Sequence, residues 1–137
     1  MNTIVVGYDD TDASKRALNR AIELAKAFGS KLLITSVAPV LDASGRSAGA
    51  IDPVDPPARH EEELREAAET IKAAGLSAEL VPALGHPAET IVQVANDNGA
   101  DMIVVGTREI SLIARVLGQS TSENVARHAR CDVLIVH

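Results

Sequence analysis

The chain has almost no aromatic residues. Among its 137 residues there is one tyrosine, Tyr8, one phenylalanine, Phe28, and no tryptophan. Proteins that bind nucleic acid need a basic surface to neutralise phosphates, and those that hold single strands also need aromatic rings on which bases stack. Here 19 acidic residues outnumber 13 lysines and arginines, which gives a net charge of -6. We therefore expect no nucleic-acid partner.

Cysteine and long apolar runs are also scarce. The single cysteine, Cys131, excludes an internal disulfide and a metal site built from cysteines alone, and its place just before an apolar run favours a buried, inert thiol. No apolar run approaches the length of about 20 residues that a membrane-spanning helix needs. The first residues read as a strand rather than as a secretory signal. We expect a soluble cytoplasmic domain without a membrane partner.

Residues that would carry catalysis or bind a metal are not grouped. The four histidines are scattered along the chain without metal-ligand spacing, which favours solvated or capping roles; they are His60, His86, His128 and His137. The motif Gly-x-x-x-x-Gly-Lys-Ser/Thr is absent, so a P-loop ATPase is excluded. The sequence indicates a protein that acts by binding rather than by turnover. It names no catalytic residue and no metal site, and slow ATP hydrolysis stays open.

What is present is a regular alternation of apolar runs and helical stripes. Hydrophobic residues make up 46 % of the chain, enough for one globular domain over residues 1–137. Five short apolar runs predict strands at Thr3–Tyr8, Lys31–Val37, Ser77–Leu84, Met102–Val105 and Val133–Val136. Between them, apolar residues at helical spacing predict four helices, over 13–28, from near 58 to 75, from 87 to 99 and from 120 to about 129.

This alternation is typical of a doubly wound, Rossmann-like α/β fold. We expect a five-stranded parallel sheet of order 3-2-1-4-5 with helices on both faces. Pro82 inside the third strand indicates an edge position, and the glycines and prolines of residues 40–59 predict a long flexible loop. Ligands of such sheets bind where the strand order reverses, here between the first and fourth strands. That point brings Asp9 beside Gly106.

The segment after the fourth strand has the layout of a phosphate site. Gly106 ends the strand, a polar loop follows, and Ser120 and Glu123 have the spacing of a capping box at the start of the last helix. Backbone N–H groups and the positive end of a helix attract anions, and glycine permits a close approach. An ordinary strand-to-helix connection has the same layout, so the segment alone leaves both interpretations open.

Three stretches of the sequence resemble the universal stress protein family. They are the opening VVGYDDTDASKRAL, the join GHPAETI, and the ending IVVGTR…ENVARHARCDVLIVH, which together cover nearly the whole chain. The resemblance implies a fold like that of the adenine nucleotide alpha hydrolases and a regulatory part in stress response. It also implies ATP or AMP as a ligand, with Mg²⁺ beside ATP, and a homodimer.

The resemblance also assigns site residues by position. Asp9 and Val37 match positions beside the adenine, and Val105 and Gly106 match positions beside the ribose. The phosphate side would be formed by residues of the loop after the fourth strand and of the start of the last helix. They are Arg108, Gly118, Ser120, Thr121 and Ser122.

The glycine motif itself is degenerate. Nucleotide-binding members of the family carry Gly-x-x-Gly, a spacer, and then Gly followed by Ser or Thr. At the same spacing this chain has Glu109 at the second glycine and Gln119 at the third, while Gly118 lies one place early. A carboxylate close to a triphosphate repels it, and lost glycines remove close backbone approach. The adenosine side therefore matches the family better than the phosphate side, and Arg108 could pair with either a phosphate or Glu109.

A response-regulator receiver and a protein–protein interaction module are the other interpretations of this sequence. A response-regulator receiver would need an aspartate after the third strand and a lysine after the last, and neither is present at Val81–Leu84 or beyond Val136. A protein–protein interaction module without a nucleotide is the alternative function. It fits the last strand, whose apolar residues Val133, Leu134, Ile135 and Val136 are expected at the edge of the sheet, where a two-fold mate would cover them.

Overall fold

The structure is a computed structural model and describes residues 1–9, 11–38, 40–41, 50–51, 57–85, 87–107 and 121–137. Its centre is a parallel sheet whose strands lie in the order β5-β2-β1-β6-β7. These strands are β1 Thr3–Gly7, β2 Lys31–Ala38, β5 Ala78–Leu84, β6 Met102–Gly106 and β7 Asp132–Val136. The helices are α1 Asp12–Phe28, α2 Pro57–Ala73, α3 Pro87–Asp97 and α5 Thr121–His128.

The strand order confirms the predicted order 3-2-1-4-5. β1 lies in the middle and pairs in parallel with β2 and with β6, so that Val6 lies opposite Ile34 on one side and Val104 on the other. The strand with the internal proline, β5, is an edge strand, as Pro82 indicates, and β7 is the opposite edge. The sheet is therefore the doubly wound type, with its order reversing between β1 and β6.

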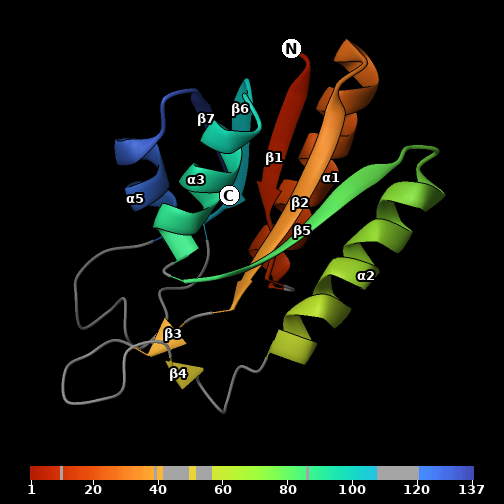
Figure 1. Cartoon of the computed structure of the whole chain (residues 1–137). Coiled ribbons are helices and arrows are strands. Elements are labelled where there is room, and N and C mark those ends of the chain that lie inside the picture. Colours follow the sequence, from red (N-terminus) through yellow and green to blue (C-terminus); the bar gives the residue numbers. More distant parts are fainter. Residues whose placement is uncertain (10, 39, 42–49, 52–56, 86, 108–120) are drawn as a thin grey trace.

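Helices cover both faces of this sheet. Side chains of α1 and α2 form one core cluster with alternate residues of the central strands, including Ile4, Val6 and Tyr8. Side chains of α3 and α5 form the second cluster with the intervening residues, including Val5 and Val105. Figure 1 shows α3 and α5 together on one side of the strands, with the two termini at separate ends of the sheet. Every strand position therefore belongs to one of two opposite faces.

The first helix begins and ends where the sequence predicts. The Thr11 side chain accepts a hydrogen bond from the backbone N–H of Ser14, which makes it the N-cap. Gly29 ends the helix with φ 65°, a left-handed conformation that glycine adopts without steric cost. Between these ends the apolar stripe faces the core, with Ala17 and Ala21 fully buried.

The stretch expected to be a long loop also holds two short strands. β3 (Val40–Leu41) and β4 (Ala50–Ile51) form an antiparallel pair, separate from the main sheet. In Figure 1 they lie beyond the carboxyl ends of β2 and β5. Two-residue strands are too short to show any period, which is why the sequence pattern missed them. Residues 42–49 and 52–56 of the expected loop lie outside the described residues.

A buried hydrogen bond ties α2 to the sheet. The hydroxyl of Ser36 in β2 donates to Oε2 of Glu63 in α2 at 2.8 Å, and the two residues are 0 % and 5 % exposed. A buried carboxyl group is costly unless it is hydrogen-bonded, so this contact favours one placement of α2 on β2. In the described segments no helix combines the length and apolar character that crossing a membrane requires.

Candidate functional site

The carboxyl ends of β1 and β6 lie side by side and form the centre of the candidate site. The two strands pair in parallel, with Val5 opposite Ile103 and Val6 opposite Val104. β1 is followed by the turn that contains Asp9, and β6 ends at Gly106. The ends of parallel strands meet at one edge of the sheet, and this pair flanks the reversal of strand order. The expected proximity of the Asp9 turn and Gly106 follows from this pairing.

Asp9 is held by the turn that leads into α1. Its Oδ1 accepts hydrogen bonds from the Thr11 hydroxyl at 2.6 Å and from the Thr11 backbone N–H at 3.2 Å. The backbone N–H of Asp9 donates to Oγ of Ser14, also at 3.2 Å, and Ser14 is 4 % exposed. These bonds fix the direction of the carboxyl group before any ligand arrives. The family resemblance assigns Asp9 to the site, whereas nothing in the sequence identifies Thr11 and Ser14 as the residues that hold it.

Gly106 lies against the first turn of α1. A Cβ atom at this position would lie 2.5 Å from the backbone C and O atoms of Ala13, closer than such atoms approach. Only a residue without a side chain therefore permits this contact between β6 and α1. The glycine that the resemblance assigns to the ribose thus has a packing reason of its own.

The side chain of Val105 lies on the face of the sheet opposite to α1, under α3 and α5. Its side chain is 4 % exposed and packs in the cluster under α3 and α5. It also faces Gly7, where an added Cβ would lie 3.3 Å from Cγ1 of Val105 and 2.9 Å from Cδ1 of Ile91. Since its side chain is buried, Val105 has mainly backbone groups to offer a ligand.

The remaining predicted residues are described only in part. Val37 lies in β2, where its backbone is opposite Ala83 of β5, and its side chain is outside the described part of the structure. Arg108, Gly118 and Ser120, with Glu109 and Gln119, also lie outside the described residues. Thr121 and Ser122 form the start of α5, as the sequence predicts, but only their backbone is described.

Thr107 joins the end of β6 to the edge strand. Its backbone N–H donates to the Val136 carbonyl at 2.9 Å, and its hydroxyl donates to the same oxygen at 3.3 Å. The segment that follows Gly106 is therefore anchored to β7 at its first residue. No sequence pattern pointed to Thr107, because this role depends on β7 lying next to β6.

Side chains of the kinds that bind metals do not form a group in the described part of the structure. Within the described ranges, no group of three or more histidine, cysteine or acidic side chains could hold a metal ion. Cys131 directly precedes β7, at the amino end of the strands and away from the candidate site, and is half-buried beside the cluster under α3 and α5. Burial and the neighbouring Asp132 carboxylate raise the pKa of its thiol, so the thiol stays protonated at neutral pH. This agrees with the expectation of an inert cysteine.

The doubly wound sheet, the polar turn after β1 and the glycine that ends β6 define a class of α/β proteins that bind ligands where the strand order reverses. Within it, the sequence matches the universal stress protein family over residues 1–137. This chain belongs to the universal stress protein family.

Individual relatives extend this comparison. A universal stress protein of Mycobacterium tuberculosis is 38 % identical over 140 residues, covering 98 % of this chain and 95 % of the relative. A solved structure described as a universal stress protein in complex with cAMP is 37 % identical, covers 99 % of this chain and 97 % of that one, and superposes with a TM-score of 0.77.

A second solved structure shares the fold at lower identity. It is the universal stress protein from Archaeoglobus fulgidus in complex with dAMP, with 24 % identity and a TM-score of 0.75 over 100 % of this chain and 98 % of that chain. At this identity the likeness supports the same sheet order and helix placement.

Proposed function

We propose that this chain is a stress-response regulatory protein that binds an adenine nucleotide at the carboxyl ends of β1 and β6. The observation that carries the proposal is the relative solved with cAMP, which is 37 % identical and aligns with 99 % of this chain. The pairing of β1 with β6 and the fixed direction of the Asp9 carboxyl group add physical support. A carboxyl group held in place before binding loses little freedom when a ligand arrives.

The proposal favours nucleotides with one phosphate, such as AMP or cyclic AMP, over ATP with Mg²⁺. The reason lies in the sequence, because Glu109 stands where ATP-binding members of the family have glycine. Each further phosphate adds charge that a nearby carboxylate repels. Thr121 and Ser122, at the start of α5, would meet the phosphate, since a helix N-terminus attracts anions.

Calorimetric titration of nucleotide-free protein tests the proposal. Cyclic AMP and AMP are expected to bind more tightly than ATP with Mg²⁺. Asp9→Asn should weaken cyclic AMP binding about tenfold, because an amide replaces the charge on the adenine side. Asparagine retains the Oδ1 acceptor that Thr11 uses, so the turn should persist. Asp12→Asn, an exposed change in the first turn of α1, is the matched control.

Two outcomes would change this picture in different ways. ATP bound as tightly as cyclic AMP would retain the adenine site and overturn the preference for one phosphate. An absence of heat and of any thermal shift with all three nucleotides would overturn nucleotide binding. The alternative function, a protein–protein interaction module with the same fold, would then be favoured.

We also propose that the chain forms a homodimer through β7. This strand is an edge of the sheet, and its residues Val133–Val136 are half-buried in the single chain. An apolar edge strand with open backbone groups favours pairing with a second copy. Ile135→Lys should lower the mass measured by light scattering from dimer to monomer. Ala83→Lys, a matched change in the opposite edge strand β5, should leave the mass unchanged.

An unchanged mass for a folded Ile135→Lys variant would contradict the dimer. Circular dichroism shows whether each variant is folded. The cytoplasmic location expected from the sequence stays a prediction, which fractionation of cells followed by immunoblotting would check.

A further inference from the structure

The end of β7 is bound by residues of the two elements that lead out of the candidate site. On one side Thr107 directly follows Gly106, and its backbone N–H and its hydroxyl donate to the Val136 carbonyl at 2.9 Å and 3.3 Å. On the other side Nε of Arg16, in α1, donates to the carbonyl of His137 at 3.1 Å. The last residues of the edge strand are therefore held both from β6 and from α1.

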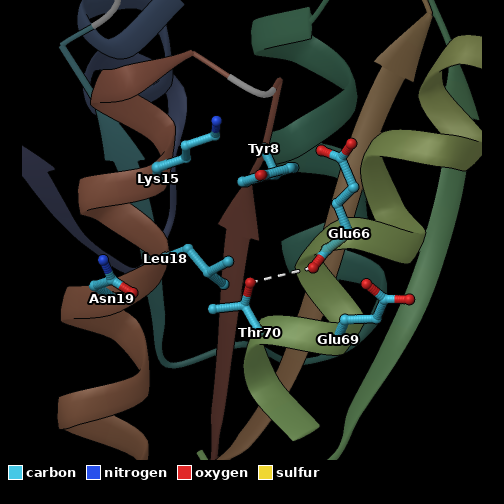
Figure 2. A pocket seen from close by; sticks show the side chains of 7 residues that line it. All are labelled: Tyr8, Lys15, Leu18, Asn19, Glu66, Glu69 and Thr70. Atoms are coloured by element: carbon cyan, nitrogen blue, oxygen red, sulfur yellow. Dashed lines mark hydrogen bonds between the residues drawn. The ribbon is translucent and has the colours of Figure 1, made fainter. Parts of the chain in front are cut away.

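Arg16 lies on the side of α1 that is turned toward β7. Figure 2 shows another side of this helix, where Lys15, Leu18 and Asn19 line a hollow between α1 and α2. Successive residues of a helix are rotated by about 100°, so Arg16 is turned away from α2. The helix itself packs against β7, which brings the Arg16 side chain within reach of the strand end.

Both contacts lead back to the candidate site within a few residues. Gly106 and Ala13 lie so close that a Cβ atom on the glycine would be 2.5 Å from backbone atoms of Ala13. Thr107 is the next residue after Gly106, and Arg16 lies about one turn along α1 from Ala13. The turn that holds the Asp9 carboxyl group leads directly into the same helix. The end of β7 therefore contacts the continuation of each half of the site.

The same strand carries the surface that we assign to a second copy of the chain. In the sheet that the structure describes, β7 pairs only with β6, and its residues Val133–Val136 are half-buried. A strand paired on one side opens more readily than one paired on both, because fewer contacts hold it. A second copy paired along β7 would therefore reduce the opening of the strand end that binds Thr107 and Arg16.

We propose that dimer formation through β7 and nucleotide binding strengthen each other. This inference rests on the proposed nucleotide site and the proposed dimer, and adds the regulation of that site. With β7 paired, Val136 and His137 hold Thr107 and Arg16 in position, so a nucleotide has less conformational freedom to remove when it binds. Energetic coupling between two sites is reciprocal, so the nucleotide also strengthens the dimer.

Two measurements on the wild-type protein test this coupling from both directions. Sedimentation equilibrium gives the dissociation constant of the dimer, without nucleotide and with saturating cyclic AMP. Equilibrium dialysis gives the affinity for radiolabelled cyclic AMP at protein concentrations below and above that constant. We expect the dimer to bind cyclic AMP about fivefold more tightly than the monomer does. Saturating cyclic AMP should then strengthen the dimer about 25-fold, which is fivefold for each of its two sites.

Variants then test whether the end of β7 carries the coupling. Thr107→Val removes the hydroxyl bond to β7, and Arg16→Met removes the guanidinium bond. Each should bring the ratio of dimer to monomer affinity closer to one. A purely structural role would weaken binding by monomer and dimer equally and leave this ratio unchanged. Thr107→Ser retains the hydroxyl and should retain the ratio, as should the matched controls Thr3→Val, at the amino end of β1, and Arg20→Met, elsewhere on α1.

Each outcome bears on a different claim. Equal affinity of monomer and dimer for cyclic AMP would overturn the coupling, while nucleotide binding and the dimer would both stand. A ratio that stays at its wild-type value in both Thr107→Val and Arg16→Met would overturn the role of the β7 end. If no nucleotide binds, the proposed function is wrong, and if no dimer forms, the proposed dimer is wrong. The coupling is overturned together with either of them.

Discussion

Gly106, the last residue of β6, is in backbone contact with Ala13, in the first turn of α1. A Cβ atom built on Gly106 would lie 2.5 Å from backbone atoms of Ala13 and 2.9 Å from the Cβ atom of Ala13. This contact couples the end of β6 to the turn that carries Asp9. A residue with a side chain at position 106 would force these two parts of the candidate site apart.

Gly106→Ala should destabilise the fold by about 1–3 kcal/mol, because backbone atoms of α1 would have to move to admit the methyl group. Gly7→Ala is the comparison, since its new methyl group would meet the far end of the Ile91 side chain, which can rotate away. Urea unfolding measures both variants. A loss for Gly106→Ala no larger than that for Gly7→Ala would contradict this contact.

Thr11→Ala should lower the free energy of unfolding by about 1 kcal/mol, the usual cost of a lost N-cap. The change removes the acceptor for the Ser14 N–H and the hydroxyl that donates to Asp9. Thr11→Ser keeps that hydroxyl and should unfold at nearly the wild-type midpoint. Thermal unfolding followed by circular dichroism distinguishes them, and equal midpoints for alanine and serine would refute the capping role.

Glu63→Ala should lower the free energy of unfolding by about 1–3 kcal/mol, because it removes the buried hydrogen bond between the Ser36 hydroxyl and Oε2 of Glu63. Glu63→Gln retains an acceptor oxygen at the same position and should cost less. Chemical denaturation of the two variants tests the ranking. If glutamine proves as costly as alanine, the charge rather than the hydrogen bond is what the site requires.

Protonation of the Asp101 carboxylate should lower the free energy of unfolding at acid pH. The backbone N–H groups of Thr3 and Asn2 donate to its Oδ2 and hold the pKa of this carboxyl below its ordinary value of 3.8. A carboxylate whose pKa is lower in the folded state contributes stability that is full above the unfolded pKa and is lost as pH falls through the folded pKa.

Asp101→Asn should therefore be less stable than the wild type at neutral pH, and the difference should shrink below about pH 4. Urea midpoints measured across this range test the expectation. Asp97→Asn, an exposed change at the end of α3, is the control. A difference that stays constant from neutral to acid pH would show that Asp101 does not act through its charge.

Much of the fold is determined locally and could be predicted from the sequence. The apolar runs and helical stripes identify the main strands and helices, since burial on both faces of a parallel sheet leaves continuous apolar strands. Pro82 indicated an edge strand because it lacks the N–H that a central strand needs. The family resemblance rests on short motifs at the strand ends, and these too are local.

Other features were decided only by the tertiary structure. The roles of Thr107 and Ser36 depend on which strand or helix lies beside them, and the two-residue strands β3 and β4 have no period to detect. Amphipathic periodicity shows that each helix buries one face, but it does not show which strands that face covers. The close contact of Gly106 with Ala13 holds α1 against β6, whereas α2 packs on β2 and β5.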